Sequence, residues 1–361
     1  MRKYKKRKQS KHFVKFINLK NLPLKKCLYI LELIILLYVI VSLVLSFKSC
    51  EKKPKSLDIT TESDSKTLLN SSDTLNIIND TTLLSSDDLE ILSNANANSI
   101  DTNILLYDSL DLDNKDNILS MFYTVDSKTG INYDLFDFNK FATTDFSLAK
   151  SNYDEPKILI FHTHGSEVYS DSTNLDEGVI GLGNLLEEEF ENTYGIQTLH
   201  VTERFDIVNG QTQILGAYER MNVYISKIIE QYPSIELILD VHRDGLPEGV
   251  KHVRTLDGEN VAPIMFVNGL SSLKSGNGYE NLSNLPNPYI EENLAFSFQT
   301  NIYGNALYPD LFKKTYLHAY RYSLHYVGKS LLVEIGAQTN TWSEAKNAVK
   351  PLAKTITNVL K

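Results

Sequence analysis

Histidine and carboxylate side chains follow three short apolar runs of this chain. The runs are KILIFH, IELILDV and SLLVEI, and each has the length and composition of a buried strand. The side chains at or just after their ends that could do chemistry are His164, Glu167, His242 and Glu334. Because the carboxyl ends of parallel strands meet at one edge of an open sheet, we expect these residues to converge.

These residue types suit a catalytic zinc site. Two histidines and one carboxylate commonly hold the ion and leave a fourth position for water. His164 and Glu167 are three residues apart and can reach one ion, with His242 as the distant third ligand. Zinc would activate the water and polarise a scissile carbonyl. A further carboxylate must then move the proton to the leaving group. Glu334 is the candidate base, because an acid at the end of an apolar strand is costly without a partner or a function.

The neighbouring polar residues have two interpretations each. His162 ends the first strand and is either a core histidine with satisfied hydrogen bonds or a direct participant. Arg243 and Asp244 either pair with each other or orient the ligands. No cysteine follows Cys50, so this part of the chain has no thiol nucleophile, no disulfide and no cysteine-ligated zinc.

Helical patterns alternate with the strands, which predicts an α/β domain. We expect a mostly parallel central sheet with helices on both faces. Further strands are predicted at 196–201 and 263–267, and helices at 177–194, 211–231, 289–303 and 343–360. Ser343 is the predicted N-cap of the last helix. No glycine-rich phosphate loop is present, so we expect neither a nucleotide nor a nucleic-acid partner.

The N-terminal part differs sharply from the rest. Residues 1–26 contain eleven Lys or Arg and no acid, so the formal net charge of −9 leaves −20 on the remainder. Residues 27–47 form an apolar segment, long enough to span the roughly 30 Å core of a bilayer, with no cleavage site after it. The positive-inside rule predicts a single-pass protein of the cell membrane, with a cytoplasmic head and an extracytoplasmic body. Residues 48–117 are predicted to be an acidic disordered stalk and 118–361 the catalytic domain.

Four blocks of the chain resemble the stage II sporulation protein P family. They are ILIFHTHGSEVY, LILDVHRDG, MFVNG followed by NPYIEENLAFSFQ, and LLVEIGAQTNTWSEA. The resemblance implies a zinc-dependent N-acetylmuramoyl-L-alanine amidase of peptidoglycan, with or without endopeptidase activity, that thins the sporulation septum during engulfment. It also implies stage II sporulation proteins D and M as partners.

Block by block, the resemblance assigns His164, Glu167 and His242 as the zinc ligands. It assigns Glu334 as the catalytic base. The third ligand stays open, because related amidases take their carboxylate from just before the next helix. Asp176 and Glu177 stand there in this chain. The chain departs from the family pattern at 321–326, where an Asn and a Gln would be expected after the Tyr.

Two other functions fit the same residues. A zinc carboxypeptidase or endopeptidase that acts only on stem peptides would use the same His-x-x-Glu…His pattern. A wall-binding scaffold could have kept the fold and lost the metal. Metal analysis separates the scaffold from the enzymes, and product masses separate the two enzymes.

Overall fold

The computed structural model describes Tyr107, residues 110–149 and residues 154–361. The predicted basic head, the apolar segment 27–47 and most of the predicted stalk lie outside these residues. Within the described ranges, no helix combines the length and apolar character that crossing a bilayer requires.

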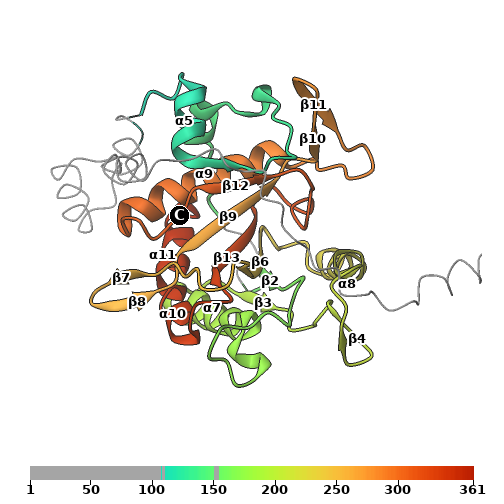
Figure 1. Ribbon diagram of the computed structural model, residues 1–361, viewed down its shortest axis with the longest axis vertical. Coiled ribbons are helices and arrows are strands. Elements are labelled where there is room, and N and C mark those ends of the chain that lie inside the picture. The colour runs from blue at the N-terminus through green and yellow to red at the C-terminus, as the bar shows by residue number, and fades with distance from the viewer. Residues whose placement is uncertain (1–106, 108–109, 150–153) are drawn as a thin grey trace, which may run out of the picture. The chain divides into compact units, whose positions relative to one another are not determined.

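A seven-stranded sheet forms the centre of the described fold, in the order β1-β12-β9-β13-β6-β2-β3 (Figure 1). In chain order its strands are β1 (Tyr123–Val125), β2 (Ile158–Phe161), β3 (Thr198–His200), β6 (Leu237–Asp244), β9 (Ile264–Gly269), β12 (Thr315–His318) and β13 (Ser330–Ala337). Neighbouring strands are parallel except β9 and β13, which run antiparallel. The predicted mostly parallel sheet is confirmed, and β1 and β12 are additional strands.

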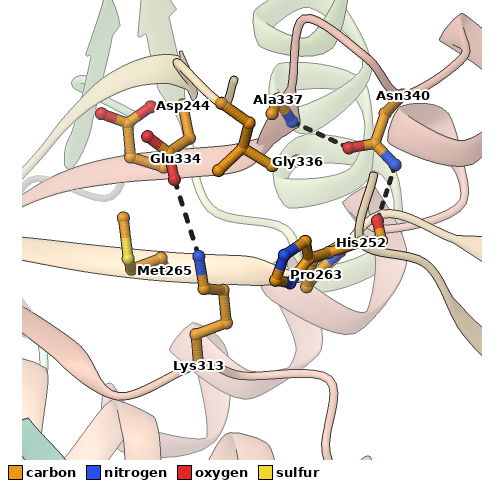
Figure 2. Close-up of a pocket in the computed structure, with 10 residues that line it drawn as sticks. Asp244, His252, Pro263, Met265, Lys313, Glu334, Gly336, Ala337 and Asn340 are labelled. Atoms are coloured by element: carbon orange, nitrogen blue, oxygen red, sulfur yellow. Dashed lines mark hydrogen bonds and ion pairs between the residues drawn. The ribbon is translucent and has the colours of Figure 1, made fainter. Parts of the chain in front are cut away.

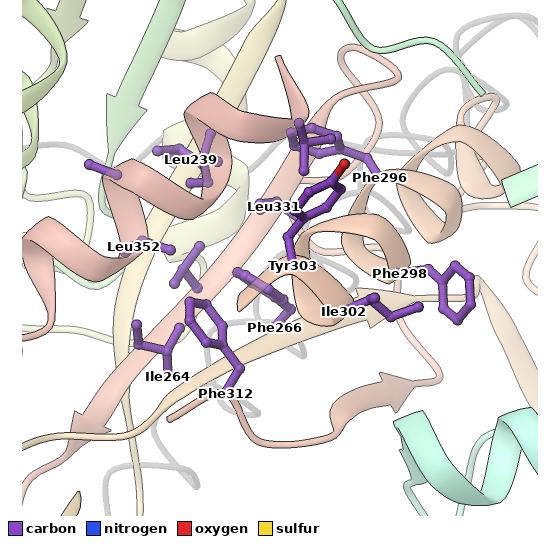
Figure 3. Packing of buried hydrophobic residues seen from close by; sticks show 14 of the residues in the cluster. Leu239, Ile264, Phe266, Phe296, Phe298, Ile302, Tyr303, Phe312, Leu331 and Leu352 are labelled. Atoms are coloured by element: carbon purple, nitrogen blue, oxygen red, sulfur yellow. The ribbon is translucent and has the colours of Figure 1, made fainter. Parts of the chain in front are cut away.

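One face of the sheet carries the main hydrophobic core. Helices α7 (Val179–Tyr194), α9 (Ile290–Leu307) and α11 (Val349–Val359) cover this face. Burial of their apolar side chains is the main force that holds these layers together. The residues that meet here, from strands and helices, include Leu239, Phe266, Leu331, Phe296 and Leu352 (Figure 3).

The opposite face is covered in part by helix α8 (Ala217–Gln231). Met221 and Ile225 of this helix pack against Leu159 and Phe161 of β2. Adjacent residues of β2 thus enter different cores, because side chains alternate across a strand. Helices therefore lie on both faces, as predicted.

The N-terminal boundary and the last helix differ from expectation. Helix α5 (Lys115–Phe122) begins before residue 118, so the predicted boundary falls inside a helix. The single helix predicted at the C-terminus is two helices, α10 (Trp342–Lys346) and α11. Thr341, rather than the predicted Ser343, is the N-cap, because its side chain and that of Glu344 form a reciprocal capping box.

The remaining elements are short. They are α6 (Phe138–Thr143), the 3-10 helices η3 (Tyr133–Leu135) and η4 (Leu175–Glu177), and the hairpins β4 (Ile207–Val208) with β5 (Gln211–Thr212), β7 (Arg254–Leu256) with β8 (Glu259–Val261), and β10 (Ser272–Ser275) with β11 (Gly278–Asn281).

Candidate active site

Three adjacent parallel strands, β2, β6 and β13, bring the predicted site residues together. Glu334 of β13 pairs in register with His242 of β6. His164 follows β2, and its ring centroid lies 5.4 Å from that of His242. In the same turn, Glu167 places its Oε2 atom 3.3 Å from Nδ1 of His242. The four residues therefore converge at one edge of the sheet.

Asp240 is a fully buried carboxylate beneath this cluster. It accepts hydrogen bonds from the backbone N–H (2.9 Å) and the hydroxyl (2.7 Å) of Thr163, which fix the turn that carries His164. Its Oδ1 lies 2.8 Å from Nε2 of His242, at ion-pair distance but without good hydrogen-bond alignment. Burial would raise the pKa of Asp240, but His242 and Thr163 lower it to about 2. The sequence could have indicated Asp240, because it is an acid inside the apolar run IELILDV. A buried acid is costly without a partner or a function, which is the argument used above for Glu334.

His242 lies between two carboxylates. Burial lowers the pKa of His242, but Asp240 and Glu167 outweigh burial and raise it well above its usual value. Burial likewise opposes ionisation of Glu167, yet His242 holds the pKa of Glu167 below its usual value. Arg243 fixes the Glu167 turn, because its backbone N–H donates to Glu167 Oε2 (3.1 Å) and its guanidinium donates to the Val168 carbonyl (3.2 Å). Arg243 thus orients a predicted ligand.

Glu334 and His164 lack such partners. Oε2 of Glu334 and Nδ1 of His164 are buried and make no hydrogen bond with the described residues. Burial raises the pKa of Glu334 to about 8, although His242 opposes this shift. Burial, followed by the charge of His242, lowers the pKa of His164. Unpaired buried polar atoms are costly, so these two side chains mark a place for a ligand or an ion.

The other candidates for the third ligand have partners away from His242; Asp176 is exposed and Glu177 is half-buried. Glu177 accepts a hydrogen bond from the backbone N–H of Thr173 (2.6 Å). Asp176, with 80% of its side chain exposed, pairs with Arg204 at 3.1 Å. Neither is among the contacts of His242, whereas Glu167 is. The geometry therefore favours Glu167 among the three.

His162 and Asp244 take no direct part in the cluster. His162 is fully buried against α7, donates from Nδ1 to the carbonyl of Val241 (2.8 Å) and has Nε2 2.8 Å from Nε2 of His200. Burial lowers the pKa of His162 to about 3. It thus occupies the face opposite α8, as a core histidine would. The carboxylate of Asp244 pairs with Lys313 at 3.6 Å, whereas the guanidinium of Arg243 donates to the backbone carbonyl of Asp244 (3.3 Å).

Two tyrosines border the cluster on the α8 side. The ring of Tyr218, in the first turn of α8, lies 5.6 Å from that of His164 and 5.4 Å from that of Tyr322. The hydroxyl of Tyr322 lies 2.7 Å from Nδ1 of His318. Tyr218 lies in the helix that the sequence predicts over 211–231, and the sequence analysis did not assign it to the site.

The donor types suit zinc, and two of the donors already have a suitable spacing. In the part of the chain that the structure describes, no three His, Cys, Asp or Glu side chains surround one point as metal ligands would. Glu167 Oε2 and His242 Nδ1, however, are 3.3 Å apart. Two ligands of a tetrahedral zinc with bonds of about 2.0–2.1 Å are separated by about 3.3 Å. The unpaired Nδ1 of His164 adds a third donor of the right type. The residues therefore fit zinc chemically.

A pocket opens beside Glu334 (Figure 2). It is lined by ten residues, which are Asp244, Leu246, His252, Pro263, Met265, Lys313, Glu334, Gly336, Ala337 and Asn340. Asn340 braces one wall, because its amide donates to the carbonyl of His252 (2.9 Å) and its carbonyl oxygen accepts from the backbone N–H of Ala337 (2.9 Å). This pocket is thus a second space next to the candidate base, apart from the two tyrosines.

Comparison with known proteins identifies a family. The sequence profile of Stage II sporulation protein P (SpoIIP) matches residues 50–357. No curated protein matches the chain. Among solved structures, the amidase AmiC2 of Nostoc punctiforme is similar at 14% identity, covering 56% of this chain and 93% of that chain, with a TM-score of 0.34. The CwlD amidase of Clostridioides difficile, solved in complex with the GerS lipoprotein, is similar at 13% identity. The match covers 56% of this chain and 98% of that chain, with a TM-score of 0.37. At these TM-scores the likeness carries no conclusion about activity.

Proposed function

The chain belongs to the stage II sporulation protein P family, and from this premise we propose that it is a zinc-dependent peptidoglycan amidase. The proposed reaction is hydrolysis of the amide bond between N-acetylmuramic acid and the L-alanine of the stem peptide. The observation that carries the proposal is the convergence of two histidines and two carboxylates, which come from the turn after β2 and from the second halves of β6 and β13. Such a donor set, with a carboxylate beside it, suits amide hydrolysis by a metal-activated water.

His164, Glu167 and His242 are the proposed zinc ligands. The ion, when bound, supplies an activated water and polarises the scissile carbonyl. Asp240 faces Nε2 of His242 and so turns Nδ1 towards Glu167. A carboxylate on the far nitrogen orients a histidine ligand and strengthens it as a donor. Arg243 orients Glu167, because its backbone N–H donates a hydrogen bond to the carboxylate of Glu167.

Glu334 is the proposed base. Its buried carboxylate favours the neutral form on its own, since burial raises its pKa to about 8. Next to bound positive charge the same carboxylate would be ionised and able to accept the proton of the attacking water. Once protonated, it can donate that proton to the leaving nitrogen, which must depart as an amine.

The test is digestion of isolated sacculi by the purified full chain in detergent, with and without a chelator. We expect release of intact stem peptides from muramic acid, loss of release with the chelator, and one zinc per chain. Products cut only within the stem peptide would support the peptidase instead. A chain that holds no metal and releases nothing would support the scaffold.

Variants of the proposed ligands sharpen this test. His164→Ala and His242→Ala should lose zinc and activity together. Glu167→Gln should empty the site, whereas Glu177→Gln should leave it filled, because the carboxylate of Glu177 accepts from the N–H of Thr173 and is not among the contacts of His242. A full equivalent of zinc in Glu167→Gln would remove Glu167 from the ligand set.

We also propose that the domain acts outside the cytoplasm, anchored by residues 27–47, at the sporulation septum. The eleven basic residues before the apolar segment support this orientation. The family's name supports a role in sporulation, with stage II sporulation proteins D and M as proposed partners. A reporter that is active only in the cytoplasm, fused after Lys361, should stay silent, and a bright signal would contradict the orientation.

A further inference from the structure

The pocket beside Glu334 is lined by apolar and by charged side chains. Pro263 and Met265, just before and within β9, are apolar members of the lining, and Asp244 and Lys313 face each other across it (Figure 2). Lys313 is the only Lys or Arg among the ten lining residues. The free space in it is only about 10 Å³, so the pocket can receive one small group, and Lys313 favours a negatively charged one.

The ammonium group of Lys313 makes no hydrogen bond with the residues that the structure describes. Its Nζ atom lies 3.6 Å from Oδ2 of Asp244, which is too long for a hydrogen bond. Its backbone is fixed, because its N–H donates to the Ile264 carbonyl (2.8 Å) and its own carbonyl accepts from the Asn301 amide (2.7 Å). An ammonium group has three donors. A firmly held backbone thus presents a cation that could bind an incoming anion.

The position of the base indicates which half of the substrate enters this pocket. Under the proposed function, Glu334 passes a proton to the leaving nitrogen, and that nitrogen belongs to the L-alanine of the stem peptide. The peptide must therefore lie on the side of the site that Glu334 faces, and Glu334 lines this pocket. Tyr218 lies instead against His164 and is not among the residues that line this pocket.

We propose that the subsite for the stem peptide lies at the mouth of this pocket, and that Lys313 there binds the free α-carboxylate of the glutamate that follows L-alanine. The proposal rests on the proposed amidase function. The glutamate is joined to the next residue through its side chain, so its α-carboxylate remains free and close to the scissile bond. Lys313 is needed there, because Asp244 and Glu334 would otherwise repel the anion.

Asp244 competes with the substrate for Lys313. Its Oδ2 faces the ammonium, while its Oδ1 accepts from the N–H of Gly245 (2.7 Å) and holds the turn. The bound carboxylate would take over the ammonium from Oδ2. Asp244→Asn keeps an oxygen for Gly245 but removes the competing charge, so this variant should bind the carboxylate more tightly than the wild type.

The experiment compares two soluble tripeptides, L-Ala-γ-D-Glu-L-Lys and the same peptide with its α-carboxylate amidated. Binding to the full chain in detergent is measured by calorimetry. We expect the wild type to prefer the carboxylate form by about tenfold or more, as for a hydrogen bond to a charged group. Lys313→Gln should abolish this preference without weakening binding of the amide form. Lys314→Gln is the matched control, because Nζ of Lys314 reaches the Ser120 carbonyl (2.6 Å) rather than the pocket.

Cleavage of N-acetylmuramoyl-L-Ala-D-Glu and of its isoglutamine counterpart separates this proposal from the amidase proposal. Cleavage of both compounds at equal kcat/KM, with equal binding of the two tripeptides, would overturn the subsite and leave the amidase intact. Binding that depends on the carboxylate and on Lys313, without cleavage, would support the pocket and overturn the amidase. A preference that persists in Lys313→Gln would also overturn the subsite.

Discussion

Carboxylates and cations gather at both ends of strands β2, β6 and β13, yet the two clusters differ in how they are satisfied. At the amino end, Glu236 accepts hydrogen bonds from Nζ of Lys157 (3.0 Å), Nζ of Lys329 (3.0 Å) and the N–H of Ala149 (3.1 Å). At the carboxyl end, Glu334 keeps a buried oxygen without a hydrogen-bond partner among the described residues. The same residue type is therefore fully satisfied at one end and left open at the other.

The pKa values follow this difference. Burial disfavours the charged form of both glutamates, but Lys157 and Lys329 outweigh it and hold the pKa of Glu236 below its usual value. For Glu334 burial prevails and raises the pKa to about 8. A satisfied cluster stabilises the fold, whereas an open one costs stability and remains available for chemistry. The contrast teaches that partners, rather than residue type, distinguish a structural carboxylate from a reactive one.

The largest expected effect is on activity. Glu334→Gln should lower the rate of stem-peptide release by about 10²- to 10⁴-fold, because general-base catalysis contributes about that much. Zinc content and melting temperature should be retained, since the change removes a charge but little volume. Glu236→Gln, assayed below its melting temperature, is the control and should keep its activity. Normal release by Glu334→Gln with normal zinc would make Glu334 a structural residue, and lost zinc would make it a ligand.

The next effect is on stability at the amino end. Glu236→Gln should lower the free energy of unfolding by ~3 kcal/mol, because breaking a buried pair leaves a charge uncompensated. Lys157, whose side chain is 3% exposed, would be that charge. The pKa of Glu236 in the folded state is lowered. Its contribution to the free energy of unfolding is therefore present above the usual pKa of a glutamate, and it is lost as the pH falls through the lowered pKa. Melting curves of wild type and variant should therefore converge at acid pH, and equal curves at neutral pH would contradict the assignment.

A smaller effect of opposite sign is expected at the carboxyl end. The pKa of Glu334 in the folded state is raised from 4.5 to about 8. Its contribution to the free energy of unfolding is therefore fully present below pH 4.5, and it is lost as the pH rises through about 8. In the chelated, metal-free chain, Glu334→Gln should therefore be more stable than wild type above pH 8, by ~2 kcal/mol after allowance for water entering the site. Melting temperatures across this pH range measure the difference. A variant less stable than wild type at pH 9 would show that Glu334 has a partner.

The smallest effect concerns the surface pair of Asp176 and Arg204. Asp176→Asn should change the free energy of unfolding by less than about 0.5 kcal/mol, as is usual for exposed ion pairs. Zinc content and activity should stay at the wild-type level, because the carboxylate of Asp176 is 80% exposed and points to Arg204. Loss of zinc in this variant would identify Asp176 as the third ligand.

The central strands of the fold could be predicted from the sequence, and the outer ones could not. Strands β2, β6 and β13 are continuous apolar runs because helices or loops bury both faces. Strands β1 and β12 are short and partly exposed, so their residues show no apolar run. The antiparallel contact of β9 with β13 was also beyond prediction, since strand direction depends on the path of the chain between strands.

The sequence predicted that the site residues converge, because they follow or end apolar runs typical of buried strands. It did not predict which other side chains surround them. The sequence analysis did not assign Asp240 to the site, because it assigned His242, two residues later, as the functional residue of this strand. Tyr218 belongs to an apolar helical stripe, and only the packing of α8 on β2 and β6 shows that its first turn reaches His164. Contacts of this kind depend on tertiary structure, which sequence periodicity does not encode.

The position of β13 also has a consequence for the order in which the molecule assembles. This strand lies between β6 and β9, but it comes after both in the chain. Until the ribosome has made residue 337, β6 and β9 are open, mostly apolar edges that could pair with another chain. Long-range pairing of this kind is slow to form. The strand that closes the sheet also delivers Glu334, so an incompletely synthesised chain lacks both a closed sheet and its proposed base.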